Sequence, residues 1–263
     1  MQEELQRRII KQLGADADRI RLQVLETVTS TNDMLRAAAE NGAPEYSICI
    51  AQQQTAGKGR QGRAFFSPAQ TGLYASFLFR PNMTPEQALA LTPMAAVAAA
   101  NAIEACTGKT MQIKWVNDLL LEGKKVCGIL AESKFSSQQK AEYIIVGIGI
   151  NLMPPPGGFP SELREIAGAV FPHNTNPQRA FTDCASGLIS AMLQEYALLP
   201  KKHYLAGYRE RLCVLNRPIT VNENGIERPA TALAVDDNLR LLVRYPDGTE
   251  QWRSTGEIRI KIS

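Results

Sequence analysis

The stretch QTAGKGRQGR, residues 54–63, interleaves three glycines with three cations and is here named the glycine–cation loop. Repeated glycine is costly to order, because glycine loses more backbone entropy on folding than any other residue. No Asp or Glu lies between Ala51 and Pro85, so this part of the chain offers its cations no carboxylate partner. We therefore interpret the loop as loose when empty and as closing on anionic ligand groups.

A second cluster lies in KWVNDLLLEGKKVCGILAE, residues 114–132. It places Lys114, Asn117 and Asp118 just before a predicted hairpin, and Lys125 at the start of the next strand. Each piece alone has an ordinary explanation, as a surface lysine or as a turn made by Asn and Asp. Only in combination with the glycine–cation loop do these residues indicate a specific site.

Two nucleotide-binding motifs fit the loop poorly. Gly57, Gly59 and Gly62 match G-x-G-x-x-G, but that motif needs a helix after the third glycine and an acidic residue about 20 positions on. Here Gly62 is followed by RAFFSP, and the later segment reads LFRPNM. The P-loop pattern G-x-x-x-x-G-K-[ST] is absent from the sequence.

A nucleic-acid-binding module is the non-enzyme alternative. The loop is rich in Arg and Gly, and Phe65 and Phe66 could serve as stacking platforms for bases. This function predicts more basic charge elsewhere, whereas the formal net charge of the chain is only +3.

Composition is that of an ordinary soluble globular protein, with 44% hydrophobic and 21% charged residues. The five cysteines are scattered, with no CxxC pair, which favours reduced thiols over a disulfide framework or a zinc site. The N-terminal residues are charged and do not resemble a signal peptide. The most apolar stretch, residues 88–106, is interrupted by polar residues and predicts a buried helix. We expect a cytoplasmic protein without a membrane partner.

The pattern of apolar and turn residues predicts how these segments are positioned. The hydroxyls and Asn of TSTND, residues 29–33, are placed to cap a helix. Thr84 to Gln87 form a predicted capping box, which opens a helix that is kinked or restarted at Pro93. Predicted helices span residues 1–13, 33–40, 85–108, 177–199 and 201–212, and predicted strands span 21–28, 46–51, 73–79, 111–115, 125–133 and 142–151. Residues 153–160, MPPPGGFP, predict an irregular loop.

After Asn216 the sequence changes to short strands separated by turn signals. These strands are predicted at residues 218–222, 228–235, 239–245, 249–254 and 257–262. Their spacing predicts a small antiparallel barrel. The fold class is therefore α+β, with a mixed domain followed by a small β domain.

The motifs STN, QTAGKGRQGR, KWVNDL, KKVCGILAE and GIGIN occur in the order seen in biotin protein ligases, which they closely resemble. The resemblance covers residues 24–262 and includes STGEI near the C-terminus. It implies a mixed-sheet catalytic domain of the class II synthetase-like, biotin–lipoate ligase type at residues 22–214. A short helical segment, residues 1–21, precedes it, and an SH3-like β-barrel, residues 215–263, follows.

The resemblance implies an ATP-dependent ligase that works in two steps. The biotin carboxylate attacks the α-phosphate of ATP, and a lysine of a biotin carboxyl carrier protein domain then attacks the resulting biotinyl-5′-AMP. The implied ligands are therefore biotin, ATP and Mg²⁺. Because charge accumulates on phosphoryl oxygens, catalysis should consist mainly of positioning and charge neutralisation.

The resemblance also implies roles for individual residues. Lys125 and Arg60 are the expected catalytic residues, and Asp118 is the expected magnesium ligand. The expected biotin-binding residues are Ser30, Thr31, Asn32, Gln54, Lys58, Gly59, Arg60, Lys125 and Gly128. The expected ATP-binding residues are Lys58, Arg60, Arg63, Asn117, Asn151 and Trp252.

Three residues depart from the pattern that the resemblance implies: Lys58 in place of Arg, Phe65 in place of Trp, and Val116 in place of Pro. A lysine in place of arginine replaces a bidentate fork by a point charge. Because residues 1–21 suffice for one helix but not for a helix-turn-helix, we expect a monofunctional ligase and no DNA partner. The resemblance allows a homodimer, and a lipoate–protein ligase is the enzymatic alternative.

Overall fold

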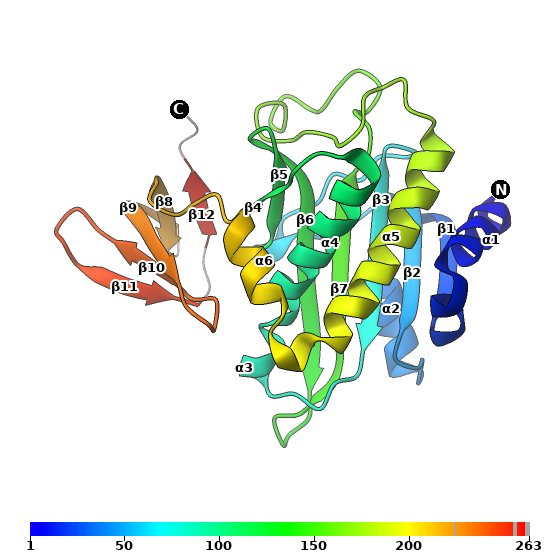
Figure 1. Cartoon of the computed structure of the whole chain (residues 1–263), viewed down its shortest axis with the longest axis horizontal. Coiled ribbons are helices and arrows are strands. Elements are labelled where there is room, and N and C mark those ends of the chain that lie inside the picture. The colour runs from blue at the N-terminus through cyan, green and yellow to red at the C-terminus, as the bar shows by residue number, and fades with distance from the viewer. Residues whose placement is uncertain (224, 255–256, 261–263) are drawn as a thin grey trace.

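A seven-stranded mixed sheet carries the two sequence clusters (Figure 1). The structure, a computed structural model, describes residues 1–223, 225–254 and 257–260. Its strands are β1 (Arg21–Val28), β2 (Ser47–Gln54), β3 (Gly72–Phe79), β4 (Gln112–Lys114), β5 (Asp118–Leu121), β6 (Lys124–Phe135) and β7 (Ala141–Asn151). Their order is β1-β2-β3-β7-β6-β5-β4. Only β1 and β2 are parallel, and the other neighbours pair antiparallel.

Helices cover both faces of this sheet. They are α1 (Gln2–Leu13), α2 (Thr31–Glu40), α3 (Pro85–Ala88), α4 (Leu91–Thr107), α5 (Pro177–Ala197) and α6 (Tyr204–Arg211). Side chains of a strand alternate between its two faces. One set packs with α4 and α5 in the main core, for example Ile48, Phe77 and Val146. The alternate set packs with Leu35 and Ala39 of α2 in a smaller core: Cys49, Leu78, Tyr143 and Ile145.

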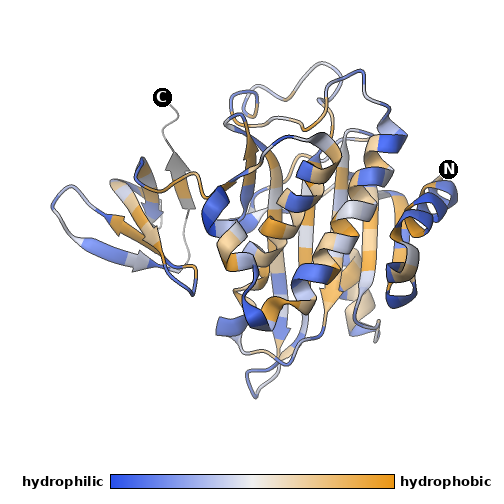
Figure 2. Cartoon of the chain, in the orientation of Figure 1, coloured by the Kyte–Doolittle hydropathy of each residue, from blue (hydrophilic) through white to orange (hydrophobic). Residues whose placement is uncertain are grey.

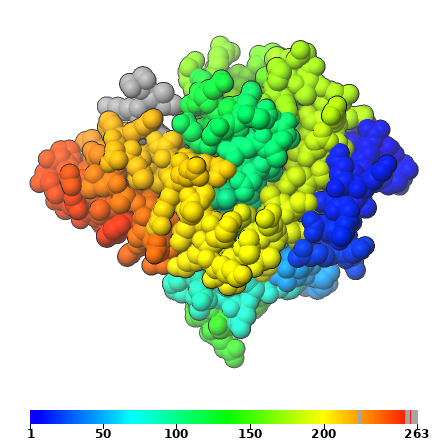
Figure 3. Space-filling view, in the orientation of Figure 1, coloured from blue at the N-terminus to red at the C-terminus, as the bar shows by residue number. Residues whose placement is uncertain are grey.

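The figures show this layering from the helical side. Figure 2 shows hydrophobic residues along the central strands and along the helices that cover them. In the space-filling view, α4, α5 and α6 fill the centre of this face, with α1 on one side (Figure 3). The other face of the sheet is the one on which α2 packs.

The apolar helix forms as predicted, but its break comes earlier. Thr84 and Gln87 make the predicted capping box at α3. The chain then leaves the helix after Ala88 and restarts at Leu91, two residues before Pro93. By length and composition residues 85–107 could cross a membrane, but 61% of their apolar window is buried inside the structure. Such burial is typical of a core helix.

The second sheet has five antiparallel strands, in the order β11-β10-β9-β8-β12. They are β8 (Pro218–Glu223), β9 (Ile226–Val235), β10 (Leu241–Arg244), β11 (Glu250–Arg253) and β12 (Glu257–Ile260), which confirms the predicted strands. The end of the strand predicted at 257–262, and part of the STGEI motif, lie outside the described residues. The small antiparallel sheet is consistent with an SH3-like domain.

The loop between β9 and β10 of the second sheet packs against the larger domain, next to β4 and α6. The indole N–H of Trp115 donates to the carbonyl of Leu239, at 2.9 Å. Arg209 pairs with Asp237 at 2.6 Å. Leu239 is only 6% exposed, and the main core continues without interruption from the larger sheet into the smaller one. Our division of the chain at residue 214 thus remains a proposal about domains that share one core.

Candidate functional site

The floor of a pocket is formed by paired residues of three neighbouring strands. Tyr74 of β3 pairs with Gly149 of β7, which pairs with Gly128 of β6. Two positions along, Ser76 pairs with Gly147. Residues two apart on a strand share a face, so these side chains and glycines face the same side as the small core under α2. The pocket encloses about 480 Å³, counting its open mouth.

The glycines of this floor give space to two side chains that cover them. An added Cβ would lie 2.5 Å from the ring of Phe65 at Gly149 and 3.0 Å from it at Gly128. At Gly147 it would collide with the side chain of Asn32. Glycine in a strand marks such close approaches. The floor is therefore bare backbone, and side chains from other segments lie directly on it.

Neutral polar groups line one end of the pocket, where α2 begins. The backbone N–H and the hydroxyl of Thr31 both donate to the side-chain oxygen of Gln54, at 2.9 and 3.1 Å. The amide N–H of Gln54 donates in turn to Ser67, at 3.1 Å. Ser30 is the N-cap of α2 but makes no side-chain capping bond, contrary to our expectation from TSTND. Gln54 instead satisfies the first N–H group of the helix.

Asn32 connects this end of the pocket to charged residues. Its oxygen lies 2.6 Å from the hydroxyl of Ser76, and its amide N–H donates to Glu132 at 2.7 Å. Asn32 and Ser76 are buried. Hydrogen bonds at both ends fix the orientation of the Asn32 amide, so it is a preorganised donor and acceptor.

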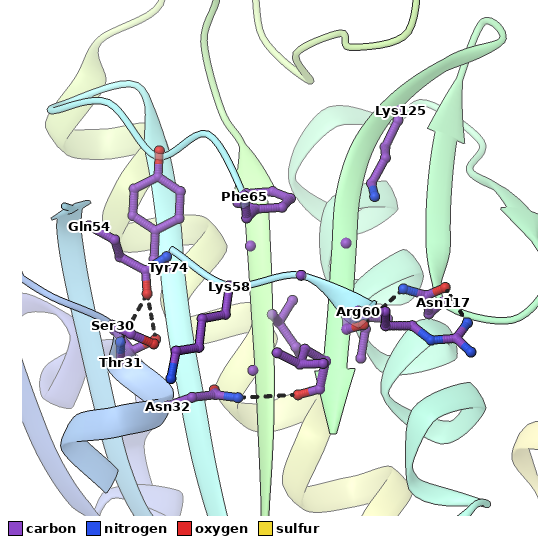
Figure 4. A pocket seen from close by; sticks show the side chains of 17 residues that line it. Ser30, Thr31, Asn32, Gln54, Lys58, Arg60, Phe65, Tyr74, Asn117 and Lys125 are labelled. Atoms are coloured by element: carbon purple, nitrogen blue, oxygen red, sulfur yellow. Dashed lines mark hydrogen bonds between the residues drawn. The ribbon is translucent and has the colours of Figure 1, made fainter. Parts of the chain in front are cut away.

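Cations line the opposite end of the pocket and the glycine–cation loop that crosses it. The ammonium of Lys125 lies 2.7 Å from the carboxylate of Asp118 and 5.9 Å from the centre of the Phe65 ring. Arg60 donates to the side-chain oxygen of Asn117 at 3.1 Å, and Asn117 donates to the carbonyl of Ile129 at 3.0 Å. Figure 4 shows Lys58 and Arg60 extending from the loop in different directions. Lys125 and Arg60 therefore place positive charge at the end of the pocket away from Asn32, whereas the ammonium of Lys58 points toward the Asn32 end (Figure 4).

The glycine–cation loop folds back on itself across the pocket. Gly59 N–H donates to the carbonyl of Arg63 at 2.7 Å, and Phe65 N–H donates to the carbonyl of Gly57 at 2.9 Å. A Cβ on Gly57 would lie 2.5 Å from the Phe65 carbonyl, so this close return requires glycine. The turn itself includes Gly62 at a φ of 73°.

The expectation that these cations have no carboxylate partner was wrong for Lys58. Its ammonium lies 2.6 Å from Asp33 of α2. The composition of residues 51–85 does not reveal this partner, because Asp33 lies earlier in the chain and is brought close only by the fold. Arg60 has an amide partner rather than a carboxylate.

Ten of the predicted site residues line the pocket: Ser30, Thr31, Asn32, Gln54, Lys58, Gly59, Arg60, Asn117, Lys125 and Gly128. The other four do not. Arg63 is exposed, and Asp118 contacts the ammonium of Lys125. Asn151 donates to the carbonyl of Gly168 at 3.0 Å, which holds the loop before α5. Trp252 lies on the edge strand β11, 41% exposed, beside the guanidinium of Arg240.

Several pocket residues were missed as site residues. They are Phe65, Tyr74, Ile129, Leu130, Gly147, Ile148 and Gly149. The alternating glycines of GIGIN were a usable signal, since they leave one face of a strand without side chains. No sequence signal pointed to Tyr74 or Glu132, because the residues that they contact come from distant segments of the chain.

Burial keeps one potentially reactive group of the pocket neutral. It raises the pKa of Tyr74, whose hydroxyl donates to the carbonyl of Pro68 at 3.2 Å. Cys127 precedes the pocket glycine Gly128, but its side chain faces the opposite side of the strand and packs in the main core. The charged groups that line the pocket are therefore Lys58, Lys125 and Arg60.

The site offers a metal ion few ligands. Within the described residues, no group of three or more His, Cys, Asp or Glu side chains comes together. Asp118 is the carboxylate beside Lys125, and its Oδ1 is buried and makes no hydrogen bond despite its contact with the ammonium. A single carboxylate of this kind suits Mg²⁺ that also binds substrate phosphates.

Residues 24–151 match the model of the biotin/lipoate A/B protein ligase family. The biotin–[acetyl-CoA-carboxylase] ligase of Paracoccus denitrificans is 32% identical over 219 residues, which cover 76% of this chain and 85% of that protein. The bifunctional ligase/repressor BirA of Bacillus subtilis is 39% identical over 142 residues, 54% of this chain. That match spans only 43% of the BirA chain.

Solved structures share the fold. A biotin protein ligase from Aquifex aeolicus, in complex with biotin and ATP, superposes with a TM-score of 0.71 at 23% identity, over 92% of this chain and 99% of that chain. The mixed-sheet fold is thus that of a biotin protein ligase. The chain belongs to the biotin/lipoate A/B protein ligase family, and within it to the biotin protein ligases.

Proposed function

We propose that the protein activates biotin with ATP and transfers it to a lysine of a biotin carboxyl carrier protein domain. One observation carries the proposal: the pocket over the strand glycines has the hydrogen-bonded side chains of Thr31, Asn32 and Gln54 at one end and the cations Lys125 and Arg60 at the other. Biotin has a ureido ring that needs donors and acceptors, an apolar chain, and a carboxylate. The pocket matches these three parts in order.

In the first step an oxygen of the biotin carboxylate attacks the α-phosphorus of ATP. The bond between the α-phosphorus and the bridging oxygen breaks, and pyrophosphate leaves with its electron pair. Both reactants are anions, so their approach is opposed by charge repulsion. Lys125 and Arg60 are the catalytic residues that lower this repulsion, because a fixed cation needs no reorganisation during the reaction.

In the second step the amine of the carrier lysine attacks the carbonyl carbon of biotinyl-5′-AMP. An amide forms, AMP leaves, and the amine loses a proton. Before transfer the mixed anhydride must be protected from water. The glycine–cation loop and Phe65 cover the floor of the pocket and supply this protection.

The ATP and metal contacts form a further part of the proposal. Lys58, Arg60, Arg63 and Asn117 would contact phosphates on the loop side, and Asn151 and Trp252 remain proposed contacts of the adenine. Mg²⁺ would be held by Asp118 together with phosphate oxygens, where it neutralises charge. We also propose a cytoplasmic location and leave the homodimer as a proposal.

Pyrophosphate exchange tests the proposal. Purified protein is mixed with ATP, Mg²⁺ and labelled pyrophosphate, and label in ATP is scored after addition of biotin or of lipoate. Exchange that depends on biotin supports the proposal. Exchange that depends on lipoate supports a lipoate–protein ligase, and salt-dependent retention of nucleic acid on filters without exchange supports a nucleic-acid-binding module.

A further inference from the structure

Four charged side chains form a chain of contacts beside the pocket. Lys58 of the glycine–cation loop contacts Asp33 at 2.6 Å, and the same Asp33 oxygen accepts from Arg36 at 2.6 Å. The other nitrogen of Arg36 contacts Glu132 at 2.5 Å. The second oxygen of Glu132 accepts from Asn32 at 2.7 Å. The loop is thereby connected to the floor of the pocket.

We propose that Asp33 is a positioning residue that holds the glycine–cation loop closed through Lys58. The inference rests on the proposed function for its role in catalysis, but not for its effect on the loop. Asp33 and Arg36 lie one helical turn apart on α2, so they face the same side of the helix. The hydrogen bond from Arg36 fixes the Asp33 carboxylate, and the same carboxylate oxygen accepts from Lys58 of the loop.

The loop is held on two sides of the pocket. Lys58 ties it to α2 through Asp33, and Arg60 ties it to the start of β5 through Asn117. The stretch between them is Gly59, which by itself gives the loop no stiffness. Loss of either contact should therefore raise the population of open loop. The pair of Lys58 with Asp33 thus gives Lys58 a role in closing the loop, beside the phosphate contact that we propose for it together with Arg60.

The partial exposure of these residues limits the expected effect. The side chains of Lys58, Asp33 and Arg36 are 40%, 31% and 34% exposed. Isolated surface pairs contribute little, but a pair fixed within a network contributes more. We expect the open population to rise by about three- to tenfold when the Lys58–Asp33 contact is lost.

Limited proteolysis tests the proposal on the ligand-free protein, whatever reaction it catalyses. An arginine-specific protease cuts after Arg60 and Arg63, and its target sites are the same in the wild type, Asp33→Asn and Lys58→Gln. Asp33→Asn and Lys58→Gln should each speed cleavage there by about three- to tenfold. The double variant should be no faster than either single variant, because both remove the same contact. Lys58→Arg adds a target site at residue 58, but its cleavage after Arg60 and Arg63, scored peptide by peptide, should keep the wild-type rate because arginine can also pair with Asp33.

Glu142→Gln is the matched control. It breaks a surface pair of similar exposure, Lys134–Glu142 at 3.1 Å, in the β6–β7 hairpin. It should leave cleavage of the loop unchanged. Wild-type cleavage rates in Lys58→Gln, or effects of Asp33→Asn and Lys58→Gln that multiply in the double variant, would overturn the proposal.

A second measurement addresses catalysis. Biotinyl-5′-AMP is supplied as such, and its dissociation rate from each variant is measured by competition with unlabelled compound. Asp33→Asn and Lys58→Gln should release it about three- to tenfold faster than the wild type, and Glu142→Gln should not. Faster proteolysis with unchanged release would overturn the catalytic part alone. Failure of the protein to bind biotinyl-5′-AMP at all would overturn the proposed function and leave the proteolysis result standing.

Discussion

The ammonium of Lys125 and the carboxylate of Asp118 lie 2.7 Å apart across strands β6 and β5. Asp118 holds the Lys125 ammonium in place, and the centre of the Phe65 ring, which lines the pocket, lies 5.9 Å from this ammonium. Lys125 is thus a cation held at one place at the end of the pocket. If it lowers the repulsion between carboxylate and α-phosphate, its removal should affect the rate of adenylation more than the fold.

Lys125→Ala should reduce biotin-dependent pyrophosphate exchange by about ten- to a hundredfold or more. Hydrogen bonds to charged groups contribute about 1.5–3 kcal/mol each, and each 1.36 kcal/mol is about tenfold in rate. The adjacent Lys124→Ala is the control, since Lys124 contacts Glu165 and backbone carbonyls at the surface. Equal exchange rates for the two variants would contradict the assignment of Lys125.

Gly147→Ala should weaken biotin binding by about tenfold or more, with the fold retained. Its Cβ would displace Asn32 and so leave buried polar groups unpaired, which costs about 1–3 kcal/mol. Titration calorimetry with biotin measures the effect. Gly187→Ala in α5 is the control, because its Cβ has room beside Ala102, at 3.9 Å. Normal biotin affinity in Gly147→Ala would mean that Asn32 does not contact the ureido ring of biotin.

The half-buried pair of Glu104 and Arg211 should make stability depend on pH. Burial alone would raise the pKa of Glu104, but hydrogen bonds from Arg211 and Met111 outweigh it and lower the pKa below its ordinary 4.5. The carboxylate therefore stabilises the fold above pH 4.5, and this stabilisation is lost as the pH falls through the folded-state pKa.

Glu104→Gln should lower the free energy of unfolding at pH 7 by about 1.5–3 kcal/mol. The difference from the wild type should shrink below pH 4.5, where the wild-type carboxyl becomes protonated. Urea denaturation at a series of pH values measures both quantities. A difference that stays constant down to acid pH would show that the charge of Glu104 contributes nothing.

Two half-buried thiols should react differently with iodoacetamide. A hydrogen bond from Cys184, whose sulfur lies 2.7 Å away, lowers the pKa of Cys106. Burial raises the pKa of Cys213. Since only the thiolate reacts, the pH midpoint of alkylation should be lower at Cys106 than at Cys213. Peptide mass spectrometry measures both in one sample. In Cys184→Ala the Cys106 midpoint should rise, and an unchanged midpoint would contradict the hydrogen bond.

Local structure was largely predictable from the sequence because it depends on neighbouring residues. The alternation of residues 21–28 predicted β1 with its observed bounds, and the MPPPGGFP segment forms no helix or strand. The start of α2 was predicted two residues late. There the helix begins at Thr31, whose backbone N–H is satisfied by Gln54 from another segment rather than by a local cap.

The contacts of the site were less predictable, because they join segments far apart in the chain. The sequence places Lys58 and Arg60 in one loop but does not show that one meets Asp33 and the other Asn117. It also does not place β7 between β3 and β6, and this order alone brings Tyr74, Gly149 and Gly128 into one row. Nor does the sequence show that Trp252, the proposed adenine contact, lies on an edge strand of the smaller sheet.

The core that runs from the larger sheet into the smaller one has a consequence for unfolding. Buried residues of the five-stranded sheet, such as Ile219 and Leu241, belong to the same cluster as Trp115 and Val214. Neither sheet can expose its interior without uncovering apolar surface of the other. Heat or denaturant should therefore melt both sheets in a single cooperative transition, with equal calorimetric and van't Hoff enthalpies, although strand content and fold differ between the two halves.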